Sequence, residues 1–189
     1  KPAKLWSDYI YLDTDERRRF AQQSHEYLIE QVQEQNGSAN TSQELYFNHP
    51  VKELIWTGAY ANGGATVDDG QIKTHENINT DTNLFTLKLN GHERFAPRQQ
   101  KYFTRVQVWE YHTGYGGVDP ADSISVYSFA LKPEEHQPSG TCNFSRIDHA
   151  VLQATTGTQT PCPATGKIFA INYNVLRIMS GMGGLGYSN

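Results

Sequence analysis

The stretch Val126–Leu152, VYSFALKPEEHQPSGTCNFSRIDHAVL, decides how the chain is interpreted. Residues 126–131 are rich in β-branched and aromatic side chains, which favour a strand. Pro133 ends this strand, because proline has no N–H for a sheet ladder and restricts the residue before it. A polar turn and the Pro138-Ser139-Gly140 break then precede a second apolar–polar run from Thr141. The stretch predicts two strands joined by a rigid connection that contains both prolines.

Further strands are predicted on either side of this stretch. Residues 83–90 show the clearest alternation, with Phe85 and Leu87 facing inward and Thr86 outward, and the Asn90-Gly91 pair that follows is a hairpin signal. In residues 51–57 Leu54 and Trp56 share one face, and Lys52 is expected beside them at the edge. With the two strands of the central stretch, the predicted strands cover residues 5–12, 26–33, 51–57, 83–90, 102–109, 124–131, 141–152 and 167–179.

One short helix is predicted early in the chain. Asp13 is a suitable N-cap for a helix over about residues 14–23, and the acidic first turn suits the positive end of its dipole. The cationic run Arg17–Arg19 is interpreted as a solvated face, with contact to a neighbouring subunit as the alternative. Residues 58–82 and 112–123 are predicted to be long polar loops.

The number and spacing of these strands predict an all-β fold. Eight antiparallel strands in two facing sheets form a jelly-roll β-sandwich, which is one way in which β proteins manage their edges. The strand spacing by itself leaves immunoglobulin-like sandwiches and other barrels open.

The central stretch also resembles a signature near the C-terminus of the major capsid proteins of large nucleocytoplasmic DNA viruses, the icosahedral algal-virus and iridovirus-like group. Residues 8–31, 48–56 and 172–189 resemble the same family in the same order, whereas residues 106–119 match it loosely. The resemblance is to the second half of such a protein. It implies that residues 1–189 form a single jelly-roll domain, the C-terminal barrel of a double jelly roll, with one short early helix. The start at Lys1, without methionine and inside a strand-like run, agrees with a missing preceding domain.

The resemblance implies a structural protein without enzymatic activity or cofactor. Three double-length chains are expected to form a homotrimer, a pseudo-hexagonal capsomer in the outer shell of an icosahedral virion assembled in the host cytoplasm. The expected partners are other copies of the chain, neighbouring capsomers and minor capsid proteins beneath the shell.

The signature residues are expected to form a structural framework. Glu134, Glu135 and His136 are residue types that can hold a metal or transfer protons, but their place on a turn between two prolines favours the framework. The family motif comprises Pro133, Glu134, Glu135, His136, Gln137, Pro138, Ser139, Gly140, Asn143, Ser145 and Arg146.

Composition limits the other function classes. The net charge of -4 and the pI near 6.0 provide no basic face for nucleic acid, so direct contact with nucleic acid is not expected. The sequence contains neither an apolar run long enough to cross a bilayer nor a signal-peptide pattern. Cys142 and Cys162 lack metal-ligand spacing and are interpreted as reduced thiols, with a disulfide between them left open.

Two polar-loop asparagines, Asn36 and Asn40, are candidate glycosylation sites, because each begins an Asn-x-Ser/Thr triplet. Asn143 begins another such triplet but lies inside the signature. A carbohydrate-binding jelly roll is the alternative function, favoured by the tyrosine and tryptophan content. A metal-dependent jelly-roll enzyme is disfavoured, because inward histidine pairs at strand spacing are missing.

Overall fold

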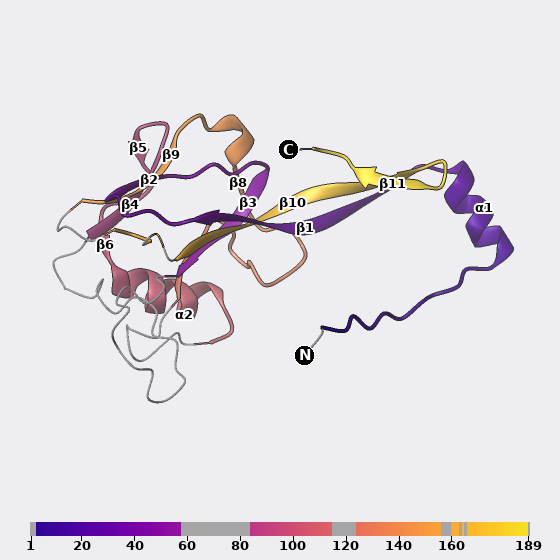
Figure 1. The fold of residues 1–189 in the computed structure, drawn as a ribbon, viewed down its shortest axis with the longest axis horizontal. Coiled ribbons are helices and arrows are strands. Elements are labelled where there is room, and N and C mark those ends of the chain that lie inside the picture. The colour runs from indigo at the N-terminus through magenta and orange to yellow at the C-terminus, as the bar shows by residue number, and fades with distance from the viewer. Residues whose placement is uncertain are drawn as a thin grey trace. The chain divides into compact units, whose positions relative to one another are not determined.

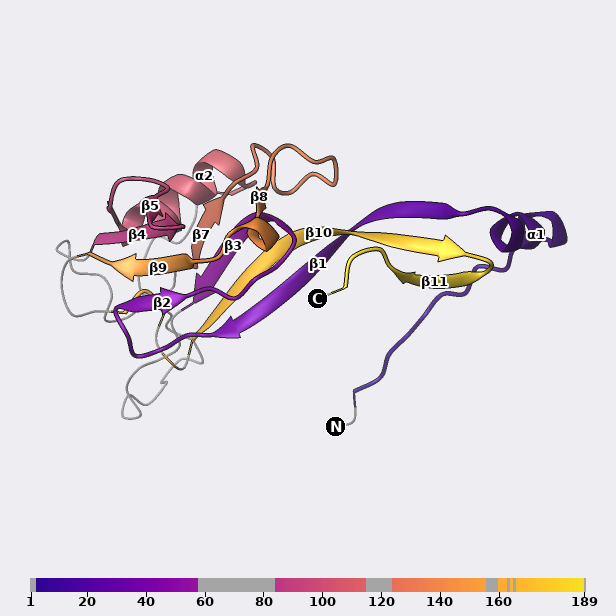
Figure 2. The ribbon, with the colours of Figure 1, turned by 90° about the horizontal axis from the view of Figure 1, so that it is seen from above.

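The structure is a computed structural model and describes residues 3–57, 84–114, 124–155, 160–162, 164 and 166–188. The chain divides into two compact units. Unit 1 contains residues 1–29 and 174–189, and unit 2 contains residues 30–173. The elements, labelled in Figures 1 and 2, are α1 (Thr14–Gln22), β1 (His25–Asn36), β2 (Ser42–Glu44), β3 (Pro50–Thr57), β4 (Leu84–Leu89), β5 (His92–Glu93), β6 (Arg98–Gln99), a π-helix (Tyr102–Val106), α2 (Gln107–Tyr111), β7 (Ser125–Ser128), β8 (Cys142–Asn143), a 3-10 helix (Phe144–Arg146), β9 (Ala150–Ala154), β10 (Lys167–Met179) and β11 (Met182–Leu185).

The described strands form two antiparallel sheets, as expected for a jelly-roll sandwich. One sheet has the order β1-β10-β3-β7, with β8 added to β3 and β11 added to β10. The other has the order β2-β9-β4-β5, with β6 added to β4. Strands distant in sequence are neighbours in both sheets, so most pairing is non-local. The predicted all-β fold class is confirmed.

The hydrophobic core lies entirely within unit 2. Alternate residues of β3, β4, β9 and β10 point into it, including Leu54, Trp56, Leu87, Leu152 and Ile168. Each of these side chains is almost completely removed from water, and the strand period of two places them on one face of their sheets.

Residues 102–109 form helices, so the predicted strand there is wrong. The period of two in YFTRVQVW is also compatible with a helix, because Phe103 and Gln107 lie four residues apart and both are buried. Phe103 packs against Trp56 and Phe95, with ring centroids 5.2 and 5.5 Å away. Tertiary packing of one aromatic ring therefore outweighs the local strand propensity.

Residues 5–12 are neither helix nor strand, so the strand predicted there is not formed in this chain. Thr86 was expected to face outward but is fully buried, and its hydroxyl donates to the Phe95 carbonyl at 2.9 Å. Lys52 was expected at an edge but is buried on β3, which has neighbours on both sides. A buried polar side chain with a partner is indistinguishable from an exposed one in the sequence pattern.

Several other predictions are confirmed. Helix α1 begins after Asp13, whose carboxylate accepts the Glu16 N–H at 2.8 Å. Asn90 and Gly91 both have positive φ and join β4 to β5 as a hairpin turn. The last long strand has the predicted bounds, Lys167–Met179. Most of the two predicted polar loops, residues 58–83 and 115–123, lies outside the described residues.

Two glutamines, Gln33 and Gln35, join the end strand β1 to the last residue of β2 and to the segment that follows it; they are called the glutamine seam. Gln33 donates to the Asn48 carbonyl at 2.7 Å and accepts the Asn48 N–H at 3.0 Å. Gln35 donates to the Glu44 carbonyl at 2.6 Å and accepts the Tyr46 N–H at 2.9 Å. The side-chain amides therefore take the place of main-chain groups in a sheet ladder.

Candidate functional site

The signature connection begins where β7 ends, on the carbonyl of Lys52. The N–H groups of Phe129 and Ala130 both donate to this oxygen, at 2.9 and 3.2 Å, and the Ser128 hydroxyl donates to the Ala130 carbonyl at 2.7 Å. Pro133 is fully buried, although it lies in a turn. The connection is therefore anchored to the sheet by main-chain contacts at its first residues and by proline packing at its centre.

The polar residues of the turn hold its two arms together. The Lys132 N–H donates to the Ser139 hydroxyl at 2.9 Å, and the Lys132 ammonium lies 2.9 Å from Glu135. Gln137 and Pro138 are exposed. Gly140 has a φ of +144°, and a Cβ at this position would lie 2.9 Å from the Phe129 carbonyl oxygen. Only glycine fits this close approach without displacing backbone.

The part of the signature after Gly140 is hydrogen-bonded to the main chain of His49. The Asn143 side chain accepts the Ser145 N–H at 3.1 Å and caps the 3-10 helix. The Ser145 hydroxyl accepts the His49 N–H at 2.8 Å, and the Phe144 N–H donates to the His49 carbonyl at 3.0 Å. Arg146 is exposed. The side chains of Asn143 and Ser145 therefore both accept hydrogen bonds from main-chain N–H groups.

Charged side chains surround the connection on two sides. Glu134 accepts the Thr113 N–H at 2.9 Å and the Thr113 hydroxyl at 3.1 Å, and lies 3.2 Å from His112 Nδ1. The other ring nitrogen of His112 lies 3.1 Å from the buried Glu53 carboxylate, without hydrogen-bond geometry. The His112 ring therefore lies between two carboxylates, that of Glu53 on β3 and that of Glu134 in the turn after β7.

A second pair of contacts centres on Glu30 of β1. Its carboxylate lies 2.8 Å from the buried ammonium of Lys52 and 3.5 Å from His136 Nδ1. The Lys52 ammonium also lies 5.6 Å from the centre of the Tyr173 ring. Glu30 and Glu53 were not singled out from the sequence, and Lys52 was expected at an edge. Alternation along a strand contains no signal that a charged residue faces inward.

The two carboxylates beside His112 have opposite pKa shifts. Burial raises the pKa of Glu53, and the charges of His112 and Lys52 oppose that shift. Hydrogen bonds from the Thr113 N–H and hydroxyl lower the pKa of Glu134, with a smaller contribution from His112. The depressed pKa of Glu134 contributes stability above its unfolded value, which is lost as the pH falls through the folded value. The raised pKa of Glu53 contributes stability at low pH that is lost as the pH rises through the folded value.

We expect substitutions at the two carboxylates to change the pH dependence of stability in opposite directions. Relative to the wild type, Glu134→Gln loses more stability at about pH 7 than at about pH 4. Glu53→Gln shows the opposite trend and loses less stability at about pH 7 than at about pH 4. Urea unfolding at both pH values measures the difference. Glu135→Gln, at an exposed carboxylate of the same turn, is the control, and identical pH profiles for all three variants would contradict the assignment.

Among the described residues, no group of three or more His, Cys, Asp or Glu side chains is placed to hold a metal ion. Glu134 and His136 contact different partners, so the signature does not bring its titratable residues together at one point. Within the same described ranges, no helix is long and apolar enough to cross a membrane.

Neither Cys142 nor Cys162 forms a disulfide, and both are thiols. Cys162 is fully buried, and burial raises the pKa of its thiol to about 12. Cys142 is half-buried, and burial raises its pKa as well. A thiol with a raised pKa is a poor nucleophile, because the thiolate is the reactive form.

We expect the two thiols to differ in reactivity. In the native protein a soluble disulfide reagent modifies Cys142 slowly and leaves Cys162 unmodified, and both react after unfolding in urea. Mass spectrometry of the intact protein and its peptides measures the order of modification. Native labelling of Cys162 at the rate of Cys142 would show that the Cys162 environment opens.

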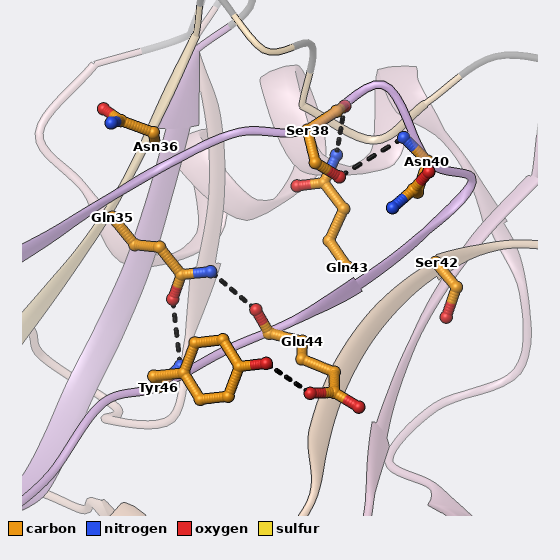
Figure 3. A pocket seen from close by; sticks show the side chains of 8 residues that line it. All are labelled: Gln35, Asn36, Ser38, Asn40, Ser42, Gln43, Glu44 and Tyr46. Atoms are coloured by element: carbon orange, nitrogen blue, oxygen red, sulfur yellow. Dashed lines mark hydrogen bonds between the residues drawn. The ribbon is translucent and has the colours of Figure 1, made fainter.

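The candidate glycosylation sites lie at a polar pocket of about 380 Å³, drawn in Figure 3. The pocket lies between the end of β1, the loop after it and β2, and Asn36 and Asn40 both line it. Both asparagines are exposed. The buried Gln43 closes one side by donating to the carbonyls of Ser38 and Cys162. Glycosylation at Asn36 and Asn40 stays a prediction.

Sequence comparison with known proteins finds relatives that belong to one protein family. The sequence profile of a family described as large eukaryotic DNA virus major capsid protein matches residues 16–184. The chain is 51% identical to the major capsid protein of Pyramimonas orientalis virus over 99% of its length and 49% of that protein. It is 41% identical to the major capsid protein of Paramecium bursaria Chlorella virus 1, covering 98% of this chain and 54% of that protein.

Solved structures agree with these sequence matches. A chain of the quasi-atomic PBCV-1 virus capsid has a TM-score of 0.71 and 37% identity, covering 96% of this chain and 56% of that chain. The Faustovirus major capsid protein has a TM-score of 0.51 at 16% identity, over 86% of this chain and 35% of that one, which shows likeness of fold alone. The chain thus spans about half the length of the curated relatives named here.

Proposed function

Because the chain belongs to the major capsid protein family of large eukaryotic DNA viruses, we propose that it is the C-terminal jelly-roll half of a shell-forming protein. The observation that supports this most strongly is 51% identity to a major capsid protein across almost the whole chain. The relatives are about twice as long, which leaves room for a second barrel.

In the assembled state, three double-length chains form a trimer whose six barrels give a pseudo-hexagonal capsomer in the outer shell of the virion. Neighbouring capsomers and minor capsid proteins beneath the shell are the other partners, and assembly takes place in the host cytoplasm. The signature connection supports this role by fixing β7, β8 and β3 to one another. The protein acts as a structural element, without chemistry or cofactor of its own.

The signature residues act in this proposal as a framework that sets the path between two strands. Pro133 is buried, Gly140 touches backbone, and Ser139, Asn143 and Ser145 bond to main-chain N–H groups. Each of these contacts is intramolecular, which is what a framework requires. Asn36 and Asn40 are the residues at which glycosylation is proposed.

The mass of the natural full-length product in solution tests the proposal. We expect light scattering to give a stable trimer of chains about twice as long as residues 1–189, and electron microscopy to show pseudo-hexagonal particles. A monodisperse monomer that turns over a substrate would overturn it, and so would a natural product without a second barrel. Specific saccharide binding by that monomer would favour the carbohydrate-binding alternative.

A further inference from the structure

The two ring nitrogens of His112 face two different carboxylates, all three groups belonging to unit 2. Nδ1 lies 3.2 Å from the Glu134 carboxylate in hydrogen-bond geometry, and Nε2 lies 3.1 Å from the Glu53 carboxylate. The side chain of His112 is 18% exposed and that of Glu53 only 5%. Nε2 and the Glu53 oxygen opposite it are both buried polar atoms without a hydrogen bond, and a contact of this kind needs a physical explanation.

A neutral imidazole does not satisfy both carboxylates. It has one N–H donor, and its other nitrogen carries a lone pair. Whichever nitrogen of His112 holds the hydrogen, the other lone pair then faces an anionic oxygen at 3.1 or 3.2 Å, which is repulsive. One additional proton removes this repulsion, because an imidazolium donates from both nitrogens. The geometry thus fits a group that holds one proton more than a neutral ring and two carboxylates.

The main chain fixes the ring in this position and favours its charged form. His112 follows directly on the helical segment 102–111, and its N–H donates to the Val108 carbonyl at 2.9 Å. A cationic side chain is stabilised at the C-terminal end of a helix, where the carbonyl oxygens point outward. The ring is therefore placed by the helix and receives its two carboxylates from other elements.

The remaining charged neighbour of this group is Lys52, which precedes Glu53 on β3. The positive charge of Lys52 favours the ionised form of Glu53, but burial outweighs it and raises the Glu53 pKa. The Lys52 ammonium also has a carboxylate of its own, that of Glu30 on β1 at 2.8 Å. Burial of Glu53 therefore helps to retain the additional proton, although Lys52 lies beside it.

We propose that His112, Glu53 and Glu134, here called the proton clamp, bind one proton that holds the signature connection against β3 and leaves as the pH rises. With the proton bound, the ring joins the turn after β7 to β3 through both nitrogens. When the proton passes to solvent, one carboxylate faces a lone pair. Glu134, which is 40% exposed and lies in a turn, is the carboxylate that moves away, because Glu53 is fixed in a sheet.

Release of Glu134 changes the surface that the turn presents. The N–H and hydroxyl of Thr113 donate to the same Glu134 oxygen that faces His112, at 2.9 and 3.1 Å, so all three contacts depend on its position. Leu131 and Gln137, on the same connection, are exposed. Because the folded chain holds the additional proton, the closed form is favoured at low pH and lost as the pH rises. Histidine side chains ordinarily change charge between about pH 5 and 8, which sets the expected range.

Amide hydrogen exchange of the natural full-length product, followed by mass spectrometry, tests the inference. We expect peptides that cover residues 129–140 to exchange at least about tenfold faster at pH 8.5 than at pH 5.5, after correction for the intrinsic effect of pH on exchange. The midpoint of this change is expected between about pH 5 and 8. Peptides from the buried strand β4 are expected to keep the same corrected rate at both pH values.

Variants assign the response to the clamp. In His112→Gln, and in Glu134→Gln if the first variant does not fold, the corrected rates of residues 129–140 are expected to be fast at both pH values. His136→Gln is the matched control, because His136 lies on the same turn, is 69% exposed and is 3.5 Å from a single carboxylate, that of Glu30. It is expected to keep the full response.

Three results would overturn the inference. The first is an equal corrected rate at both pH values in the wild type, and if that protein still forms trimers the proposed function stands. The second is a response that His112→Gln keeps and His136→Gln loses, which would assign the proton to His136. The third is a midpoint below about pH 5, which would show that a carboxylate alone titrates.

Discussion

Replacing Gly140 with alanine is expected to lower the free energy of unfolding by about 3–5 kcal/mol. The added Cβ would lie 2.9 Å from the Phe129 carbonyl oxygen and 3.4 Å from the Ala130 Cα, both backbone atoms. The φ of +144° adds conformational strain that L-residues rarely accept. Urea unfolding of the purified chain, followed by tryptophan fluorescence, measures the loss.

Two other glycines provide matched controls for this substitution. Gly91 has a φ of +83° with open space around its Cβ position, so Gly91→Ala isolates backbone strain and is expected to cost about 1–2 kcal/mol. Gly114 has open space as well, and Gly114→Ala is expected to be nearly neutral. If Gly140→Ala costs no more than Gly91→Ala, the close approach to Phe129 is absent in solution.

Replacing Phe103 with alanine is expected to cost about 3–5 kcal/mol, because the ring is completely buried and its removal leaves a cavity. The Trp56, Phe95 and Tyr102 rings, all with centroids within 5.5 Å, would lose their contacts with it. The measurement is again the free energy of unfolding in urea, together with near-ultraviolet circular dichroism for the packing of the aromatic rings.

Trp109 provides the control for Phe103, since it lies in the adjoining helix α2 and is 73% exposed. Trp109→Ala is expected to change the stability of the isolated chain by less than about 0.5 kcal/mol. Phe103→Leu, expected to cost less, keeps the comparison measurable if Phe103→Ala does not fold. Equal losses for Phe103→Ala and Trp109→Ala would contradict the helical assignment of residues 102–111.

The parts of the fold that were predictable are those with a strong local signal. The alternation in residues 84–89, the Asn90-Gly91 turn and the Asp13 cap each depend on neighbouring residues, and each is present in the structure. The failure at residues 102–109 has the opposite cause. The helical form there depends on where Phe103 packs, which is a contact between residues far apart in sequence.

The site was predictable in part for the same reason. The position of Pro133 and Gly140 in a turn follows from their chemistry, and the structure places both at close contacts. The ion pairs Lys52–Glu30 and His112–Glu53 were missed, because each joins residues more than twenty positions apart. No pattern of charge along one strand distinguishes an inward lysine with a partner from an outward one.

The glutamine seam has a consequence for how the protein ages. Each of its two amides supplies one donor and one acceptor to main-chain groups of the neighbouring segment. Slow hydrolysis of such an amide yields glutamate, which keeps the length of the side chain but replaces the donor with a second acceptor. At Gln33 this product would place an anionic oxygen against the Asn48 carbonyl, and repulsion would part the two segments. Loss of a single ammonia molecule, with no break in the polypeptide, is thus expected to weaken the contact between β1 and the segment after β2.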